Sequence, residues 1–239
     1  MSQWGFYFDQ SRCLGCKTCM LACKNWNELR RGDNKINIRD MTQYEVGEGR
    51  KEKGNTYIDS TGQTNYKEFR KFYMKENWRK IETYESGVVL TNSDNTIKST
   101  FDRRYVSISC NHCEKPKCVD ACPAGNIVKD TDTGIVLAGK SCLSCGKCRE
   151  ACPWDAPQFY DEIGNYSLGD PDRPLMTKCT MCYDRINEGL KPACVAACWN
   201  RAMDAGPMDE LKARYPKATQ RINEFQDFGV GPNMIFKAK

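Results

Sequence analysis

The sequence predicts an α+β protein built of two small domains, one nested in the other, with a long inserted lobe. Three observations lead to this prediction. Sixteen cysteines fall into four groups of four with none left over. Segments of partly alternating apolar and polar residues, which are typical of strands, precede or separate these groups. The stretch between Cys23 and Cys110 contains no cysteine at all.

The strands are predicted from short apolar runs and their alternation. Residues 4–9 (WGFYFD) form a candidate strand that leads into the first cysteine group, and residues 105–109 (YVSIS) one that leads into the second. Residues 126–129 and 134–137 flank the turn-forming run DTDT, which indicates a hairpin. We expect this strand pair between the second and third groups.

Helices are predicted from their stop signals and from the cysteine loops. We expect short helices after each fourth cysteine, and a helix over residues 207–215 that ends before Pro216. Residues 229–239 are expected to be extended. In the cysteine-free stretch, the pattern favours a helix near residues 65–80 and a hairpin across residues 87–101. This polar, tyrosine-rich stretch is interpreted as a lobe that covers the rest of the protein or contacts a partner.

The cysteine spacing is the strongest signal in the sequence. The first and third groups repeat the spacing C-x2-C-x2-C-x3-C, the second has a four-residue middle gap, and the fourth has an eleven-residue middle gap. The first group is Cys13, Cys16, Cys19 and Cys23; the second is Cys110, Cys113, Cys118 and Cys122. The third is Cys142, Cys145, Cys148 and Cys152; the fourth is Cys179, Cys182, Cys194 and Cys198.

This spacing has a geometric reason in iron–sulfur proteins. Three thiolates on a tight loop can bind three corners of one 4Fe–4S cube, while the fourth points away. In bacterial ferredoxins that fourth cysteine binds the other cluster of a pair. The four groups therefore predict two pairs, which gives four 4Fe–4S clusters.

Other uses of the cysteines fit the pattern less well. Three cysteines within seven residues are hard to bridge mutually as disulfides. Zinc prefers two C-x2-C pairs on either side of a longer loop, which the fourth group alone satisfies. A radical-generating enzyme needs the spacing C-x3-C-x2-C, which does not occur. His112 is the only histidine, so a two-histidine Rieske centre is excluded, and we interpret its role as packing or hydrogen bonding near a cluster.

Pairing of the groups predicts how the chain is organised. The second and third groups are close in sequence, and the first and fourth lie outside them. We therefore expect one ferredoxin-like domain nested inside another. The predicted boundaries are residues 1–26 plus 166–239 for the outer domain, 27–104 for the inserted lobe, and 105–165 for the inner domain.

Charge and hydropathy exclude two kinds of partner. The formal charge of +5 would invite a nucleic-acid partner, but sixteen thiolates outweigh the positive charge of four cluster cores and make the loaded protein acidic. Nucleic-acid binding is therefore not expected. The sequence shows no secretory signal and no run of about 20 apolar residues, so we expect no direct membrane insertion. Any membrane attachment is then through a partner, on a side that the sequence does not specify.

Four segments resemble a known family. Residues 13–24 (CLGCKTCMLACK), 109–113 (SCNHC), 151–158 (ACPWDAPQ) and 178–192 (KCTMCYDRINEGLKP) are similar to the iron–sulfur subunit of the dimethyl sulfoxide reductase family of molybdopterin oxidoreductases. The likeness covers most of the chain outside residues 27–104. Some relatives carry tryptophan in place of a third-group cysteine and hold a 3Fe–4S cluster. Cys145 is present here, so four cubes are expected.

The resemblance implies a non-catalytic electron-transfer subunit. Its partners would be a catalytic subunit with molybdopterin (molybdenum or tungsten) and a membrane-anchor subunit that binds quinol. The implied ligands are Cys13, Cys16, Cys19 and Cys198 for cluster 1, and Cys179, Cys182, Cys194 and Cys23 for cluster 2. For cluster 3 they are Cys110, Cys113, Cys118 and Cys152, and for cluster 4 Cys142, Cys145, Cys148 and Cys122.

Two alternatives stay open at this point. The chain could relay electrons in a soluble molybdopterin or tungstopterin complex that has no membrane anchor, which co-purification would reveal. A self-sufficient redox enzyme is the other alternative. It is disfavoured because the sequence contains no phosphate-binding loop, nucleotide fingerprint or nucleophile–base arrangement. The substrate chemistry belongs to the catalytic subunit, which is another chain.

Overall fold

The computed structural model describes residues 2–27, 77–92, 94, 96–139, 141–159 and 176–239. Its strands are β1 (Trp4–Asp9), β2 (Lys80–Ser86), β3 (Val89–Thr91), β4 (Ile97–Ser99), β5 (Asp102–Ile108), β6 (Ile127–Lys129), β7 (Val136–Ala138), β8 (Gln158–Phe159), β9 (Met176–Thr177), β10 (Met203–Pro207) and β11 (Met234–Lys237). Its helices are α1 (Thr18–Trp26), α5 (Lys117–Asp120), α6 (Lys147–Glu150), α7 (Tyr183–Asn187), α8 (Ala193–Ala196) and α9 (Met208–Arg214). The predicted α+β composition is confirmed.

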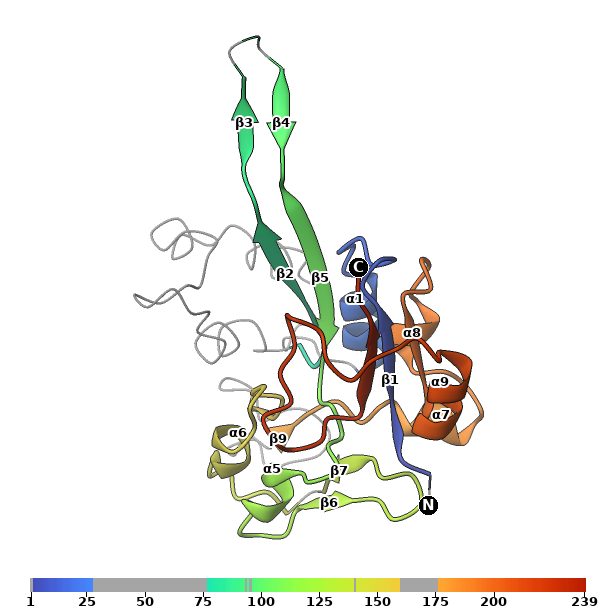
Figure 1. Ribbon diagram of the computed structural model, residues 1–239. Coiled ribbons are helices and arrows are strands. Elements are labelled where there is room, and N and C mark those ends of the chain that lie inside the picture. The colour runs from blue at the N-terminus through green and yellow to red at the C-terminus, as the bar shows by residue number, and fades with distance from the viewer. Residues whose placement is uncertain (1, 28–76, 93, 95, 140, 160–175) are drawn as a thin grey trace.

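The two ends of the chain meet in one sheet. Its strand order is β10-β1-β11, with β1 antiparallel to β10 and parallel to β11. Figure 1 shows the dark-red C-terminal strand beside β1. Alternation along β1 separates two apolar faces: Phe6 and Phe8 enter the main core, whereas Tyr7 packs with Leu211 of α9. The predicted strand over residues 4–9 is confirmed, and so is the helix before Pro216.

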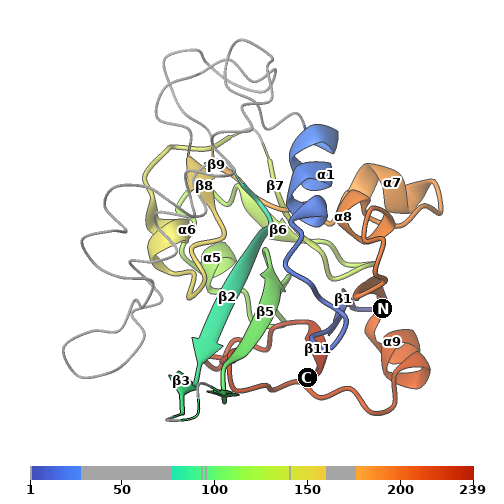
Figure 2. The same ribbon diagram turned by 90° about the horizontal axis from the view of Figure 1, so that it is seen from above.

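A long antiparallel ribbon extends from the body. β2 pairs with β5 from Lys80↔Ile108 to Ser86↔Asp102, and β3 pairs with β4 beyond them (Figure 1). Its base is buried at Ile81 and Val106, while β3 and β4 are exposed along their whole length. Figure 2 shows the same ribbon from above, reaching away from the helices. The predicted hairpin across residues 87–101 is confirmed, and its pairing continues further into the body than expected.

Aromatic side chains connect the cysteine loops to the C-terminal segment. The Trp154 ring is fully buried and stacks on Phe225, with 5.5 Å between ring centroids. Phe228 meets the same indole edge-on, and Phe225 in turn contacts Phe236 of β11. Offset and edge-on aromatic pairs are favourable beyond the area that they bury. The loop that follows Cys152 is therefore fixed against the end of the chain.

Two expectations about helices are wrong. The short helices do not follow each fourth cysteine; α1, α5, α6 and α8 carry cysteines themselves, because the helical turn lies between the cysteines of a group. The predicted helix near residues 65–80 lies outside the described residues except for its last four. These are not helical, since Lys80 already pairs with Ile108 in the ribbon.

Other expectations stand as follows. The hairpin between the second and third cysteine groups is confirmed as β6 and β7, and β11 makes part of the final segment extended. Most of the predicted lobe over residues 27–104 lies outside the described residues, so the three-part division of the chain stays a prediction. No helix in the described ranges has the length and apolar character that crossing a membrane requires.

Candidate metal centres

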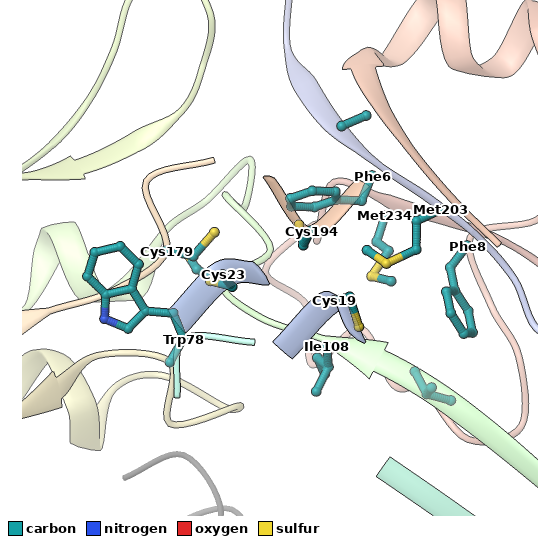
Figure 3. Close-up of a cluster of buried hydrophobic side chains, with 14 of the residues drawn as sticks. Phe6, Phe8, Cys19, Cys23, Trp78, Ile108, Cys179, Cys194, Met203 and Met234 are labelled. Atoms are coloured by element: carbon teal, nitrogen blue, oxygen red, sulfur yellow. The ribbon is translucent and has the colours of Figure 1, made fainter. Parts of the chain in front are cut away.

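All sixteen cysteines lie in the described part of the chain, and none of them forms a disulfide there. Helix α1 carries Cys19 and Cys23 one turn apart and packs against α8, which carries Cys194. Figure 3 shows these three side chains, together with Cys179, among buried apolar residues of the core. The thiols are therefore held inside the protein, close to one another.

Two surface pockets are each lined by four cysteines. One, of about 340 Å³ counting its opening, lies beside the first cysteine loop. Its cysteines are Cys13, Cys16, Cys19 and Cys198. The other, of about 300 Å³, lies beside α6. Its cysteines are Cys122, Cys142, Cys145 and Cys148. In both pockets three cysteines come from one group and the fourth from another.

The four cysteines that lie together are here called a set: the first set lines the pocket beside the first cysteine loop, and the fourth set lines the pocket beside α6. The pKa shifts of the thiols indicate the same two sets. Burial raises the pKa of Cys13 to about 11, and the thiols of Cys198 and Cys16 add to the rise. Burial also raises the pKa of Cys148 to about 11. The thiols that add to this rise are Cys142, Cys122 and Cys145. Such repulsion between buried thiolates disappears when a cation binds them.

The remaining eight cysteines form two further sets, of which the one around Cys23 is wholly buried. Burial raises the pKa of Cys23 well above its ordinary value, and the thiols that add to this are Cys179, Cys194 and Cys182. Burial likewise raises the pKa of Cys113. The thiols that add to this rise are Cys110, Cys152 and Cys118. Each of these sets again combines three cysteines of one group with one cysteine of another.

Neighbouring sets also influence one another. The thiol of Cys194 raises the pKa of Cys19, which burial brings to about 12. Cys110 has the same effect on Cys179, and Cys148 on Cys118. These three pairs connect the first set to the second, the second to the third, and the third to the fourth.

The backbone around the first cysteine of every group adopts one conformation. The residue two positions after it has a positive φ: Gly15 (68°), His112 (44°), Ser144 (55°) and Met181 (56°). Such left-handed geometry costs roughly 1–2 kcal/mol for residues other than glycine. It aims the amide of that residue at the preceding sulfur: Ser144 N lies 3.3 Å from Cys142 Sγ, and Met181 N lies 3.4 Å from Cys179 Sγ.

A second repeat surrounds the fourth cysteine of three groups. Gly125, Asp155 and Arg201, each three residues after it, have positive φ values of 57°, 48° and 50°. The next residue then donates its amide hydrogen to the sulfur. These bonds are Asn126 N to Cys122 Sγ (3.3 Å), Ala156 N to Cys152 Sγ (3.4 Å) and Ala202 N to Cys198 Sγ (3.3 Å). Amides directed in this way stabilise negative charge on sulfur, and they are one means by which proteins tune iron–sulfur centres.

The donor chemistry suits an iron–sulfur cluster. Each set offers four sulfur ligands, amide donors and an apolar surround, which is what cubes bound by four cysteines require. No group of three or more His, Cys, Asp or Glu in the described ranges is arranged to hold a single metal ion. A zinc site needs all its sulfurs within about 2.3 Å of one ion, whereas a cube binds each thiolate at a different iron.

Two buried polar residues, His112 and Arg79, lie near the cysteines, and only the first was marked by the sequence. His112 is fully buried, and its Nδ1 accepts the Val136 amide at 3.1 Å, which confirms that it packs and forms hydrogen bonds beside the cysteines. Burial lowers the pKa of His112 well below its ordinary value, and the charges of Lys178 and Arg79 act in the same direction. Arg79, within the stretch that has no cysteine, is also buried against the core. Nothing in the local sequence pattern marks Arg79, because its neighbours come together only in the fold.

Comparison with known proteins agrees with this geometry. A model of the 4Fe-4S dicluster domain matches residues 101–208, and a model of a 4Fe-4S binding domain matches residues 4–25. The B subunit of anaerobic dimethyl sulfoxide reductase from Haemophilus influenzae is 35% identical over 90% of this chain and 79% of its own length. The corresponding B subunit from Escherichia coli K12 is 34% identical over 90% and 78%.

A more distant relative comes from a different enzyme. The formate dehydrogenase-O iron-sulfur subunit of Escherichia coli K12 is 27% identical over 92% of this chain and 58% of that subunit. The identity and mutual coverage with the two B subunits are high enough to assign the family. This protein belongs to the family of the iron–sulfur B subunits of anaerobic dimethyl sulfoxide reductase and is an electron-transfer, 4Fe–4S-binding subunit of that kind.

Proposed function

We propose that the chain holds four 4Fe–4S clusters and relays electrons between a molybdopterin catalytic subunit and a quinone-linked membrane partner. One observation carries the proposal: two pockets are each lined by four cysteines drawn from two sequence groups. That combination is what exchange of the fourth ligand between paired groups requires. The chain itself supplies no substrate chemistry in this proposal; the clusters, when bound, take up and release single electrons.

The proposed ligands follow the four sets of neighbouring thiols. Cluster 1 is assigned to Cys13, Cys16, Cys19 and Cys198, and cluster 2 to Cys23, Cys179, Cys182 and Cys194. Cluster 3 is assigned to Cys110, Cys113, Cys118 and Cys152, and cluster 4 to Cys122, Cys142, Cys145 and Cys148. Thiol pairs between successive sets support a linear order from cluster 1 to cluster 4. The same pairing supports the nested arrangement of two ferredoxin-like domains.

The exposure of the cysteines differs along the proposed order from cluster 1 to cluster 4. Cys16 in the first set and Cys145 in the fourth are exposed. All four cysteines of the second set are buried. Electron exchange with another protein requires a short path to the surface, so the two ends of the line are the positions suited to it. We assign the cluster 1 end to the catalytic subunit and the cluster 4 end to the quinone side.

The partners are inferred from relatives. The related B subunits are parts of anaerobic dimethyl sulfoxide reductase, and the more distant relative is a subunit of formate dehydrogenase-O. We infer a molybdenum- or tungsten-pterin catalytic partner for this chain, and attachment to the membrane through a further subunit. A hydrophobic helical protein that co-purifies with the full chain would support this attachment. A complex in which every subunit is soluble would contradict it.

The first prediction concerns metal content. Anaerobically purified protein will contain about sixteen irons and about sixteen acid-labile sulfides per chain, since four cubes carry four of each. Iron and sulfide analysis of the full chain, normalised to quantitative amino-acid analysis, measures this. Stoichiometric zinc with little iron would refute the proposed clusters.

The second prediction concerns removal of the metal. Chelation of iron under reducing conditions will abolish the cooperative unfolding transition, because binding energy at such sites is also folding energy. The main apolar core includes Cys19, Cys110 and Cys194, so the clusters lie where a larger protein would have aliphatic side chains. Fluorescence of the buried Trp154 and near-ultraviolet circular dichroism report the loss. A chain that keeps its native near-ultraviolet spectrum without iron would contradict the prediction.

A further inference from the structure

Arg79 is a buried cation among the cysteines. Only 1% of its surface is exposed, and its guanidinium carbon lies 4.5 Å above the centroid of the Phe6 ring. In the described part of the chain, no carboxylate forms an ion pair with Arg79, and its Nε has no hydrogen-bond partner. A charge buried in this way is costly unless opposite charge lies nearby.

Cysteines of two sets lie near Arg79, and as cluster-binding thiolates they would supply the opposite charge. Burial by itself lowers the pKa of Arg79, but the thiols around it outweigh burial and raise it above its ordinary value. Those thiols are Cys194, Cys179, Cys19 and Cys23. The influence is mutual, since Arg79 opposes the rise in the pKa of Cys19 and of Cys179. Arg79 therefore interacts with the proposed ligands of both cluster 1 and cluster 2.

Hydrogen bonds fix the guanidinium in this position. Nη1 donates to Ser107 Oγ at 3.1 Å, and Nη2 donates to Ser109 Oγ at 2.8 Å. Ser107 Oγ in turn lies 3.6 Å from Cys19 Sγ. The two serines come from β5 and the residue just after it, on either side of Ile108, so one strand holds both arms of the planar fork. Arginine suits such a site because its donors have fixed directions and its charge is permanent.

We propose that Arg79 is a fixed positive charge that raises the reduction potentials of clusters 1 and 2. This inference rests on the proposed function. Reduction adds a negative charge to a cluster, so a nearby cation stabilises the reduced state, and hydrogen bonds to sulfur act in the same direction. Arg79 acts directly on the second set and, through the Ser107 hydroxyl, on Cys19 of the first. It is a positioning and tuning residue rather than a ligand.

The test is Arg79→Gln in the full chain loaded with clusters. Redox titration followed by electron paramagnetic resonance gives the midpoint potentials, and ligand variants of Cys198 and Cys23 identify the signals of clusters 1 and 2. We expect the equilibrium constant for reducing each of these clusters to fall by at least about tenfold, which is about 59 mV for one electron. Cluster 4 will not change. Arg79→Lys, which keeps the charge, will retain most of the wild-type potential.

A matched control removes the same charge elsewhere. Arg103 lies on β5, half-exposed, and pairs with Glu85 at 2.7 Å. Arg103→Gln therefore changes the net charge by the same amount without removing charge from the core, and all potentials will stay at their wild-type values. A fall of similar size in Arg103→Gln would contradict the proposed local action of Arg79.

Several outcomes separate this inference from the proposed function. Wild-type iron content is measured first, and a low value refutes the clusters themselves. If Arg79→Gln has full iron content and unchanged potentials of clusters 1 and 2, the proposed role of Arg79 is refuted, while the proposed clusters are not. A tenfold fall in Arg79→Lys would also overturn it. If Arg79→Gln does not take up clusters, Ser107→Ala decides: a fall confined to cluster 1 supports the inference, and no fall refutes it.

Discussion

Replacing Cys198 with serine will damage the cluster of the first cysteine group, which lies at the other end of the sequence. Cys198 lines the same pocket as Cys13 and Cys16, and its thiol acts on the pKa of Cys13. We expect iron content to fall by about one cluster in four, or the affected cluster to change its spin state and potential. Resonance and Mössbauer spectra of the full chain, compared with wild type, measure the change.

The matched variant for this experiment is Cys23→Ser. Cys23 belongs to the first group by sequence, but its neighbours are the thiols of the fourth group. Its replacement will therefore damage cluster 2 and leave cluster 1 intact, the opposite of the effect of Cys198→Ser. If each variant instead damages the cluster of its own sequence group, the exchange of fourth ligands is refuted.

Replacing Cys145 with alanine will separate the two ends of the proposed electron path. Cys145 is an exposed cysteine in the pocket beside α6, so its loss removes one ligand without opening the core. We expect a 3Fe–4S cluster of higher potential at this place. Electrons from quinol would be retained there, and quinol-linked turnover will fall by at least about tenfold, since each rise of about 59 mV disfavours onward transfer tenfold.

The control is an artificial donor that reduces the catalytic subunit directly. Its activity does not need the cluster 4 end, so it will survive in the same preparation of Cys145→Ala. Loss of both activities in an assembled, iron-loaded complex would show that the assigned direction is reversed or that no quinone side exists. Cys16→Ala provides the mirror experiment, because Cys16 is the exposed cysteine of the first set.

Much of the site was predictable because its constraints are local. The spacing of the cysteines predicted groups that work in pairs, and two pockets are each lined by cysteines of two groups. Strand β1 and the hairpin of β6 and β7 were predictable from apolar runs and a turn signal. Gly15 and Gly125 adopt left-handed geometry in the turns that direct amides at sulfur, which glycine does without strain.

Other features depend on contacts between distant segments. Arg79 reaches Ser107 and Ser109 only because β2 pairs with β5, and no pattern in its own segment shows that it is buried. The short helices were misplaced because the helical turn lies between the cysteines rather than beyond them. His112, Ser144 and Met181 adopt positive φ values without being glycine, since the chain must turn there to surround the sulfurs.

The position of β1 has a consequence for synthesis of the protein. This strand is made well before both of its neighbours in the sheet, β10 and β11, which follow it by about 200 residues or more. Asp9 bonds to Lys237 across 228 residues of sequence. On a ribosome, β1 therefore remains without these neighbours until β10 and β11 have been made, while β6 and β7 and the cysteines around them can already associate. The β6–β7 hairpin can therefore form before β1 is incorporated into its sheet.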